Sequence, residues 1–146
     1  MLITSRISLA GLLVLGLMSC ASPTTPAETV LKKVTGSTIR VIETVEGPRG
    51  VDAVVAVDGE QPLARQLALS SMNSSPVAIN SDPRPCQRLS AISQLTPSAT
   101  CTETQVVAEE IRERGSVCQL KAYETSDLIT VDGEALRRGL ITVICS

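Results

Sequence analysis

The sequence predicts an α+β domain with a mostly antiparallel sheet, one main helix, a short C-terminal helix and two disulfides. Three observations indicate this class. Runs rich in Val, Ile and Thr are separated by turns that contain Gly and Pro, which is typical of short strands. One segment, residues 102–114, combines a capping pattern with helical spacing of its apolar residues. Four cysteines lie beyond an apolar N-terminal segment. The expected order of elements is β-β-(β)-loop-α-β-β-α-β.

Two segments at the start of the domain are expected to pair as a hairpin. Residues 37–45 read STIRVIETV and residues 51–57 read VDAVVAV, so both are rich in β-branched side chains. The run Glu46-Gly47-Pro48-Arg49-Gly50 between them is a turn signal. The second strand is therefore expected to return directly alongside the first.

Residues 61–69 fit either a helix or a strand. Pro62 can open a helix in which Leu63 and Leu67 stack one turn apart. The alternation of leucine with other residues through this run slightly favours a strand. Residues 76–80 are read as another short strand. Residues 81–99 contain three prolines and are expected to form a long surface loop with room for one short helical turn.

Residues 102–114 are expected to form the main helix. Thr102 and Gln105 have the spacing of a capping box, and Val107 and Ile111 would form the inner stripe. A glycine follows the last residue, as is usual where a helix ends.

The rest of the chain is expected to form three strands and one short helix. Residues 116–123, 127–131 and 140–145 are the strands, because each is rich in β-branched or alternating apolar residues. Asp132 is read as the N-cap of a helix over residues 134–138.

Residues 1–20 have the parts of an export signal, and an even number of cysteines in an exported chain indicates a disulfide framework. Two disulfides are therefore expected among Cys86, Cys101, Cys118 and Cys145. A helix of about 12 residues after Cys101 would span roughly 18 Å, and the strand that follows could return only ~10 Å by Cys118. Since a bridge needs Cα atoms within about 7 Å, Cys86–Cys101 with Cys118–Cys145 is favoured. Cys86–Cys118 with Cys101–Cys145 stays open.

Residues 1–20 have the parts of an export signal, with Arg6 near the start and an apolar run from Ile7 to Met18. The run is about 12 residues long, shorter than the roughly 20 that a spanning helix needs. The segment Leu17-Met18-Ser19-Cys20 closes it and resembles the lipobox of bacterial lipoproteins. That resemblance implies cleavage before Cys20 and attachment of acyl chains such as palmitate to this residue. The alternative is an ordinary cleaved signal with a chance cysteine.

The lipobox resemblance divides the chain into three parts. Residues 1–19 are the signal peptide, residues 20–36 are the lipidated N-terminus and a flexible tether, and residues 37–146 are a single small domain. Within the tether, residues 29–35 either continue the flexible chain or form one turn. The Pro- and Thr-rich start of the tether, at ~3 Å per residue, would hold the domain about 25–30 Å from the membrane. Ala21 in place of Asp resembles the pattern of lipoproteins sent to the outer membrane, where the domain would face the periplasm.

Composition excludes several classes of chemistry. The chain has no His, so it has no Ser-His or Cys-His pair and no imidazole metal ligand. Its net charge is −2 without a basic cluster, which argues against a nucleic-acid partner. The repeated VDGE motif places Asp58 near Glu60 and Asp132 near Glu134, but two carboxylates at a turn are ordinary. We therefore expect no catalytic residues, no metal and no cofactor.

The segment Val131–Leu140, VDGEALRRGL, is similar to the end of the staphylococcal-nuclease-like OB fold, in which a short helix closes the domain. The similarity covers residues 105–140, and it implies an OB fold. The sequence departs from the family where the chemistry would lie. No Tyr-Gly-Arg run precedes the segment, and Arg88-Leu89 is not followed by Asp-x-Pro-Glu. The resemblance therefore does not imply nuclease activity.

These observations predict a lipoprotein of the cell envelope that acts as a non-enzymatic binding or assembly module. Its partners would be the membrane, through Cys20, and an envelope protein. The alternative is a small exported enzyme of unrecognised or degenerate type, for example one with a nuclease-like OB fold.

Overall fold

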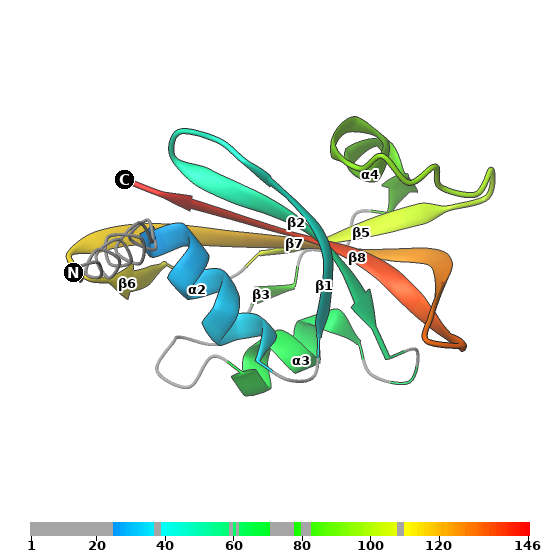
Figure 1. Ribbon diagram of the computed structural model, residues 1–146, viewed down its shortest axis with the longest axis horizontal. Coiled ribbons are helices and arrows are strands. Elements are labelled where there is room, and N and C mark those ends of the chain that lie inside the picture. The colour runs from blue at the N-terminus through cyan, green and yellow to red at the C-terminus, as the bar shows by residue number, and fades with distance from the viewer. Residues whose placement is uncertain are drawn as a thin grey trace, which may run out of the picture.

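The computed structural model describes residues 25–36, 39–58, 60, 62–70, 78–79, 83–107 and 110–146. The signal peptide and Cys20 lie outside these residues. Within them, a twisted sheet separates two layers of helix: α2 and α3 cover one face, and α4 covers the other (Figure 1). We call these the α2 face and the α4 face.

The strands form one sheet in which every described pairing is antiparallel. Their order is β1-β2-β8-β7-β5-β3, while β4 pairs with β5 and β6 pairs with β7. The long β7–β8 hairpin is the centre of the sheet, and the strands at the β3 edge are short. The strands are β1 (Arg40–Glu46), β2 (Gly50–Val57), β3 (Ala78–Ile79), β4 (Arg84–Pro85), β5 (Thr102–Val107), β6 (Ile111–Glu113), β7 (Ser116–Val131) and β8 (Glu134–Cys145).

Both faces of the central strands are buried. Strand β2 directs Val51, Ala53, Val55 and Val57 into the main core on the α2 face, and it directs Val54 into a smaller cluster on the α4 face. Successive side chains of a strand point to opposite faces, so one Val-rich strand serves both layers. This confirms the expected hairpin and its β-branched strands.

Helix α2 (Pro26–Thr35) lies in the range that we expected to be a flexible tether, and that expectation is wrong from Thr25 onward. The Thr25 hydroxyl accepts from the Glu28 N–H, and the Glu28 carboxylate accepts from the Thr25 N–H, which is a full capping box. Pro26 occupies the first turn, where its missing N–H has no cost. Burial of Val30 and Val34 docks the helix on the sheet.

Helix α3 spans Leu63–Ser70, so the slight preference for a strand over residues 61–69 was wrong. The helical alternative was right because Leu63 and Leu67, one turn apart, are both fully buried on the α2 face. The Leu63 N–H donates to Glu124 Oε1 at 3.1 Å, which satisfies an N–H in the first turn of the helix.

The segment that we expected to be the main helix, residues 102–114, instead forms β5 and β6. Strand β5 pairs with β7 from Glu103 opposite Thr125 to Val107 opposite Lys121. The pairing gives the backbone groups partners in the sheet and buries Val106, so tertiary pairing outweighs the helical spacing.

The short C-terminal helix expected over residues 134–138 is also absent, because these residues begin β8. Asp132 and Gly133 have φ of 51° and 82°, and they form a two-residue turn between β7 and β8. Positive φ at both central residues is the turn type that joins antiparallel strands, so Asp132 turns the chain and caps no helix. The three predicted strands around this turn are confirmed, with residues 116–123 and 127–131 joined in β7.

Both expected disulfides are present. Cys86 bridges Cys101 with Cα atoms 5.5 Å apart, and Cys118 bridges Cys145 with Cα atoms 4.0 Å apart. Cys118 and Cys145 are direct neighbours across β7 and β8. The pairing is as predicted, but the helix that we used to exclude Cys101–Cys118 does not exist.

Candidate functional site

Residues 83–101 form a loop across the α4 face, and α4 (Gln87–Ile92) lies within it. We call residues 83–101 the stapled loop, because the disulfide Cys86–Cys101 joins its two sides. The Cys86 N–H also donates to the Cys101 carbonyl at 3.3 Å. A long loop with little regular structure usually needs such a fastening or a function.

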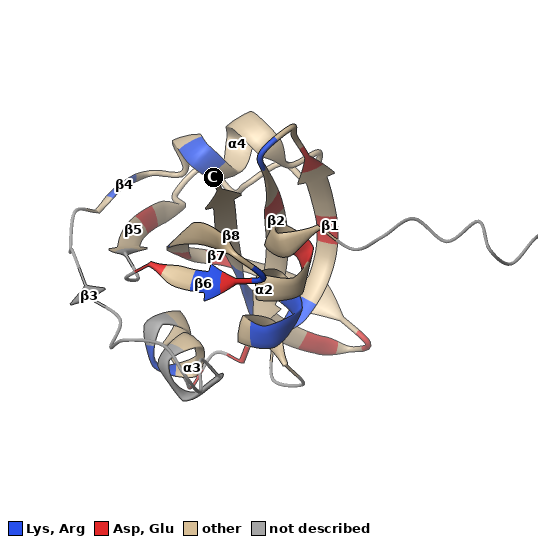
Figure 2. Cartoon of the chain, turned by 90° about the vertical axis from the view of Figure 1, so that its left-hand side faces the viewer, with Lys and Arg blue, Asp and Glu red and all other residues tan. Residues whose placement is uncertain are grey.

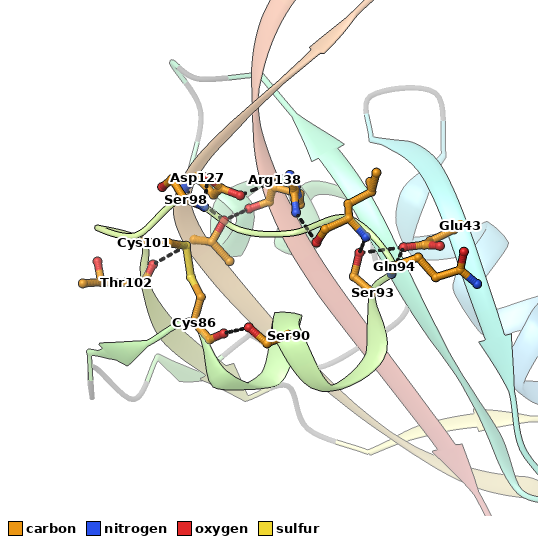
Figure 3. A network of polar contacts seen from close by, with 12 residues as sticks. Glu43, Cys86, Ser90, Ser93, Gln94, Ser98, Cys101, Thr102, Asp127 and Arg138 are labelled. Atoms are coloured by element: carbon orange, nitrogen blue, oxygen red, sulfur yellow. Dashed lines mark hydrogen bonds and ion pairs between the residues drawn. A yellow bond between two sulfur atoms is a disulfide. The ribbon is translucent and has the colours of Figure 1, made fainter.

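Carboxylates from two different strands hold the two ends of α4. Glu103 on β5 accepts from the Arg88 N–H at 3.0 Å in the first turn of the helix. Glu43 on β1 accepts from the Ser93 hydroxyl at 2.6 Å and from the Gln94 N–H at 3.1 Å, just past its last turn (Figure 3). The strands thus fix the helix at both ends.

A buried ion pair supports the loop from the sheet. Arg138 of β8 and Asp127 of β7 lie 3.2 Å apart, and their side chains are only 7% and 5% exposed. The Arg138 guanidinium donates to the Leu95 carbonyl at 3.0 Å, and Asp127 accepts from the Ser98 N–H at 3.1 Å (Figure 3). Each partner of the ion pair therefore also binds the backbone of the stapled loop.

An apolar cluster completes the attachment. Leu89 of α4 is fully buried in a cluster with Val54 and Leu140 of the sheet and the Cys86–Cys101 bridge. The stapled loop is therefore held by a covalent bond, by charged groups and by apolar packing. Each of these constraints removes conformational freedom that a binding event would otherwise have to remove.

A shallow cleft of about 290 Å³ lies between α4 and strands β5 and β7. We call it the Tyr123 cleft, because it contains the only aromatic residue of the chain. Arginine, glutamine and tyrosine side chains dominate its lining, which suits hydrogen bonding to a polar partner. The residues that line it are Arg84, Gln87, Arg88, Ala91, Glu103, Gln105 and Tyr123.

Two charged residues line the cleft, one buried and one partly exposed. Glu103 is 6% exposed, and its Oε2 has no hydrogen-bond partner among the described residues. Arg88 lies 3.8 Å from Asp52 Oδ1, and Asp52 in turn accepts from the Thr142 hydroxyl at 2.6 Å. The guanidinium of Arg88 thus lies at the edge of the cleft, 42% exposed and held only loosely.

Asp58, Asp132 and Glu134 of the two VDGE motifs each have a partner within the protein. Asp58 accepts from the Glu60 N–H at 3.0 Å, which closes a local turn. Asp132 and Glu134 both form ion pairs with Arg40, at 3.2 and 3.3 Å. Within the described part of the chain, no three His, Cys, Asp or Glu side chains come close enough to hold a metal ion.

Sequence reasoning missed the groups that hold the stapled loop. Glu43, Asp127 and Arg138 come from three strands, and no spacing in the sequence relates them to residues 93–98. The capping box at Thr25 and Glu28 was also missed, although Thr-Pro-Ala-Glu before an apolar stripe is a local signal for the start of a helix.

Comparisons of the chain with protein-family models, with curated proteins and with solved structures gave no match. The similarity to the nuclease-like OB fold also loses its main support, because the closing helix that it required is part of β8. Among the helices that the structure describes, none is long and apolar enough to cross a membrane.

Proposed function

We propose that this chain is a lipid-anchored protein of the bacterial cell envelope that binds a protein partner through the stapled loop and the Tyr123 cleft, without catalysis. The attachment of the stapled loop is the observation that carries the proposal. Glu103 and Glu43 hold the two ends of α4, and the ion pair of the sheet holds the loop that follows it. The helix nevertheless exposes Gln87, Arg88 and Ala91.

A rigid, exposed surface is suited to binding. A partner that docks on an ordered loop does not have to offset the entropy of ordering it. The cleft beside the loop presents Tyr123 and Arg88, and tyrosine and arginine are among the side chains most often found at the energetic centres of protein interfaces. These features support a protein as the partner.

The anchor part of the proposal comes from Leu17-Met18-Ser19-Cys20. Acyl chains on Cys20 would hold the protein at the membrane, since several chains on one residue give stable attachment. With Ala21 after the cysteine, we propose the outer membrane, with the domain on its periplasmic side.

Photocrosslinking in native envelopes tests the partner surface. A photoreactive residue in place of Ala91 should crosslink to a discrete envelope protein, because this position lies on the exposed side of α4 between the cleft and the solvent. The same residue in place of Lys32, which is exposed on α2 beyond the opposite face of the sheet, is the matched control. Mass spectrometry of the crosslinked band identifies the partner.

A second variant tests the chemistry of the cleft. Arg88→Ala should reduce crosslinking from position 91 several-fold while thermal unfolding stays almost unchanged, because its ion pair with Asp52 is partly exposed and long. Equal crosslinking from positions 91 and 32, or no crosslink from position 91, would overturn the proposed surface. Acyl groups on Cys20, and their loss in Cys20→Ser, test the anchor separately.

A further inference from the structure

The capped start of α2 limits how far the domain can lie from its anchor. Thr25 is the N-cap of a helix that is docked through Val30, Leu31 and Val34. Thr25 lies five positions after Cys20, and five residues reach at most ~18 Å when fully extended. The reach from the lipid to the folded domain is thus shorter than the roughly 25–30 Å that a longer tether would allow.

The start of α2 lies at one end of the molecule, together with the turn between β1 and β2 and the C-terminus (Figure 1). The Cys145 N–H donates to the Arg49 carbonyl at 2.9 Å, and the Arg114 guanidinium donates to the Thr29 hydroxyl at 3.2 Å. We call this end the anchor pole, and it is formed by residues 25–29, 46–50, 114–116 and 145–146.

The opposite end of the molecule is far from this pole. Strand β7 has 16 residues and begins at Ser116 in the anchor pole, so at about 3.3 Å per residue its path is roughly 50 Å long. The irregularity between Glu124 and Leu128 bends this path, so the direct distance between its ends is shorter. It ends in the turn at Asp132 and Gly133, at the other side of the view in Figure 1. The stapled loop reaches toward this far end, since the Ser98 N–H binds Asp127 near the end of β7.

The net charge of the anchor pole does not determine how the domain is oriented on the membrane. Figure 2 looks onto the anchor pole, and β6 beside it carries neighbouring basic and acidic segments. Within the anchor pole, Glu28 and Glu46 are balanced by Arg49 and Arg114, which leaves little net charge to attract lipid. The short stretch of chain between Cys20 and Thr25 is therefore what limits the orientation of the domain.

We infer that the anchor pole lies against the lipid headgroups and that the far end of the β7–β8 hairpin points away from the membrane. The inference rests on the lipid anchor of the proposed function. With Cys20 at the bilayer surface, α2 must start within ~18 Å of it, and the groups that share the end of the molecule with Thr25 are brought to the same depth. The occupant of this surface is the lipid headgroup layer, and the far end of the stapled loop is left free for the protein partner.

Headgroup quenching tests this orientation on the full, acylated protein in vesicles of phosphatidylethanolamine and phosphatidylglycerol. A fluorophore is attached through a ketone-bearing phenylalanine that replaces Arg49 in the anchor pole, or Leu128 near the far end, where the side chain is 61% exposed. Lipids with nitroxide headgroups should quench the fluorophore at position 49 several-fold more than the one at position 128.

A spacer variant is the matched control. Insertion of about 30 Gly/Ser residues after Ala21 adds a flexible chain with an end-to-end distance of roughly 30 Å, so quenching at position 49 should fall toward the level at position 128. Equal quenching at both positions in an acylated chain would overturn the orientation and leave the anchor standing. A chain without acyl groups on Cys20, shown by mass spectrometry, would overturn both.

Discussion

At the scale of single residues, the Arg138–Asp127 pair stands out because two charges are buried together under a surface loop. Each charge is compensated twice, once by the other at 3.2 Å and once by a backbone group of the stapled loop. The Thr125 hydroxyl also donates to the Arg138 carbonyl, which ties the two strands together beside the pair. A buried charge is tolerated only with such partners.

Asp127→Ala should lower the free energy of unfolding by about 3–5 kcal/mol, because it leaves the Arg138 guanidinium buried without its counter-charge. Urea unfolding monitored by circular dichroism measures the change. Glu134→Ala is the control, because Glu134 forms its ion pair with Arg40 while its side chain is 62% exposed; it should change stability by no more than about 1 kcal/mol.

The comparison between these two variants is what tests the role of burial. Similar losses in both would show that burial does not determine the strength of these ion pairs. A double variant, Asp127→Leu with Arg138→Leu, should recover much of the loss, because it removes both charges and fills the same space with apolar atoms.

At the scale of secondary-structure elements, the approach of the first residues of β2 to β8 depends on a glycine. Gly50 begins β2 opposite Ile144, and a Cβ atom at this position would lie 2.1 Å from the Val143 carbonyl oxygen. At Gly47, in the turn, a Cβ atom would meet nothing closer than the Gly50 carbonyl oxygen at 4.0 Å. Of these two glycines, only Gly50 is therefore needed for strand packing.

Gly50→Ala should destabilise the domain by about 1–3 kcal/mol, because the strands must separate to admit the methyl group. Gly47→Ala should change stability by no more than about 0.5 kcal/mol. Thermal unfolding of both variants under identical conditions makes the comparison. A Gly50→Ala protein as stable as the Gly47→Ala protein would contradict the close packing of β2 on β8.

At the scale of the whole molecule, the two disulfides reinforce opposite faces of the sheet. Cys118–Cys145 joins β7 to β8 in the main core on the α2 face, whereas Cys86–Cys101 lies in the smaller cluster on the α4 face. Bridges of this kind usually stabilise by about 2–4 kcal/mol. Because the two bridges lie on opposite faces of the sheet, we expect the removal of each to loosen a different part of the domain.

Replacing Cys86 and Cys101 by Ser should loosen the stapled loop while the centre of the sheet stays protected. Hydrogen exchange should accelerate over residues 87–99 and stay slow in β7 and β8, because the loop has its own attachments and contributes little to the main core. Replacing Cys118 and Cys145 by Ala should instead accelerate exchange across the sheet. Uniform acceleration in both variants would show that the two faces unfold as one unit.

The sequence predicted the hairpin and the strands of the central sheet, because these depend on β-branched runs and turn signals that act locally. It also favoured the observed cysteine pairing, but by way of a helix over residues 102–114 where the structure has strands. It did not predict that residues 63–70 form a helix, or that residues 102–107 and 111–113 form strands. Both segments carry apolar residues at spacings compatible with either structure. The turn at Asp132-Gly133 was misread, although Asp-Gly between two strand-like runs is itself a hairpin signal.

The sequence by itself determined where this chain has residues that favour strands, that four cysteines are available for two bridges, and the lipobox pattern on which its proposed location rests. Only the tertiary structure decided that residues 102–107 pair with β7, that α2 begins at Pro26, and that Glu43, Asp127 and Arg138 converge on the stapled loop. The reason is physical. Local preferences differ by less than the free energy gained when a strand finds its partner or a helix buries its apolar face, and those partners lie far away in the chain.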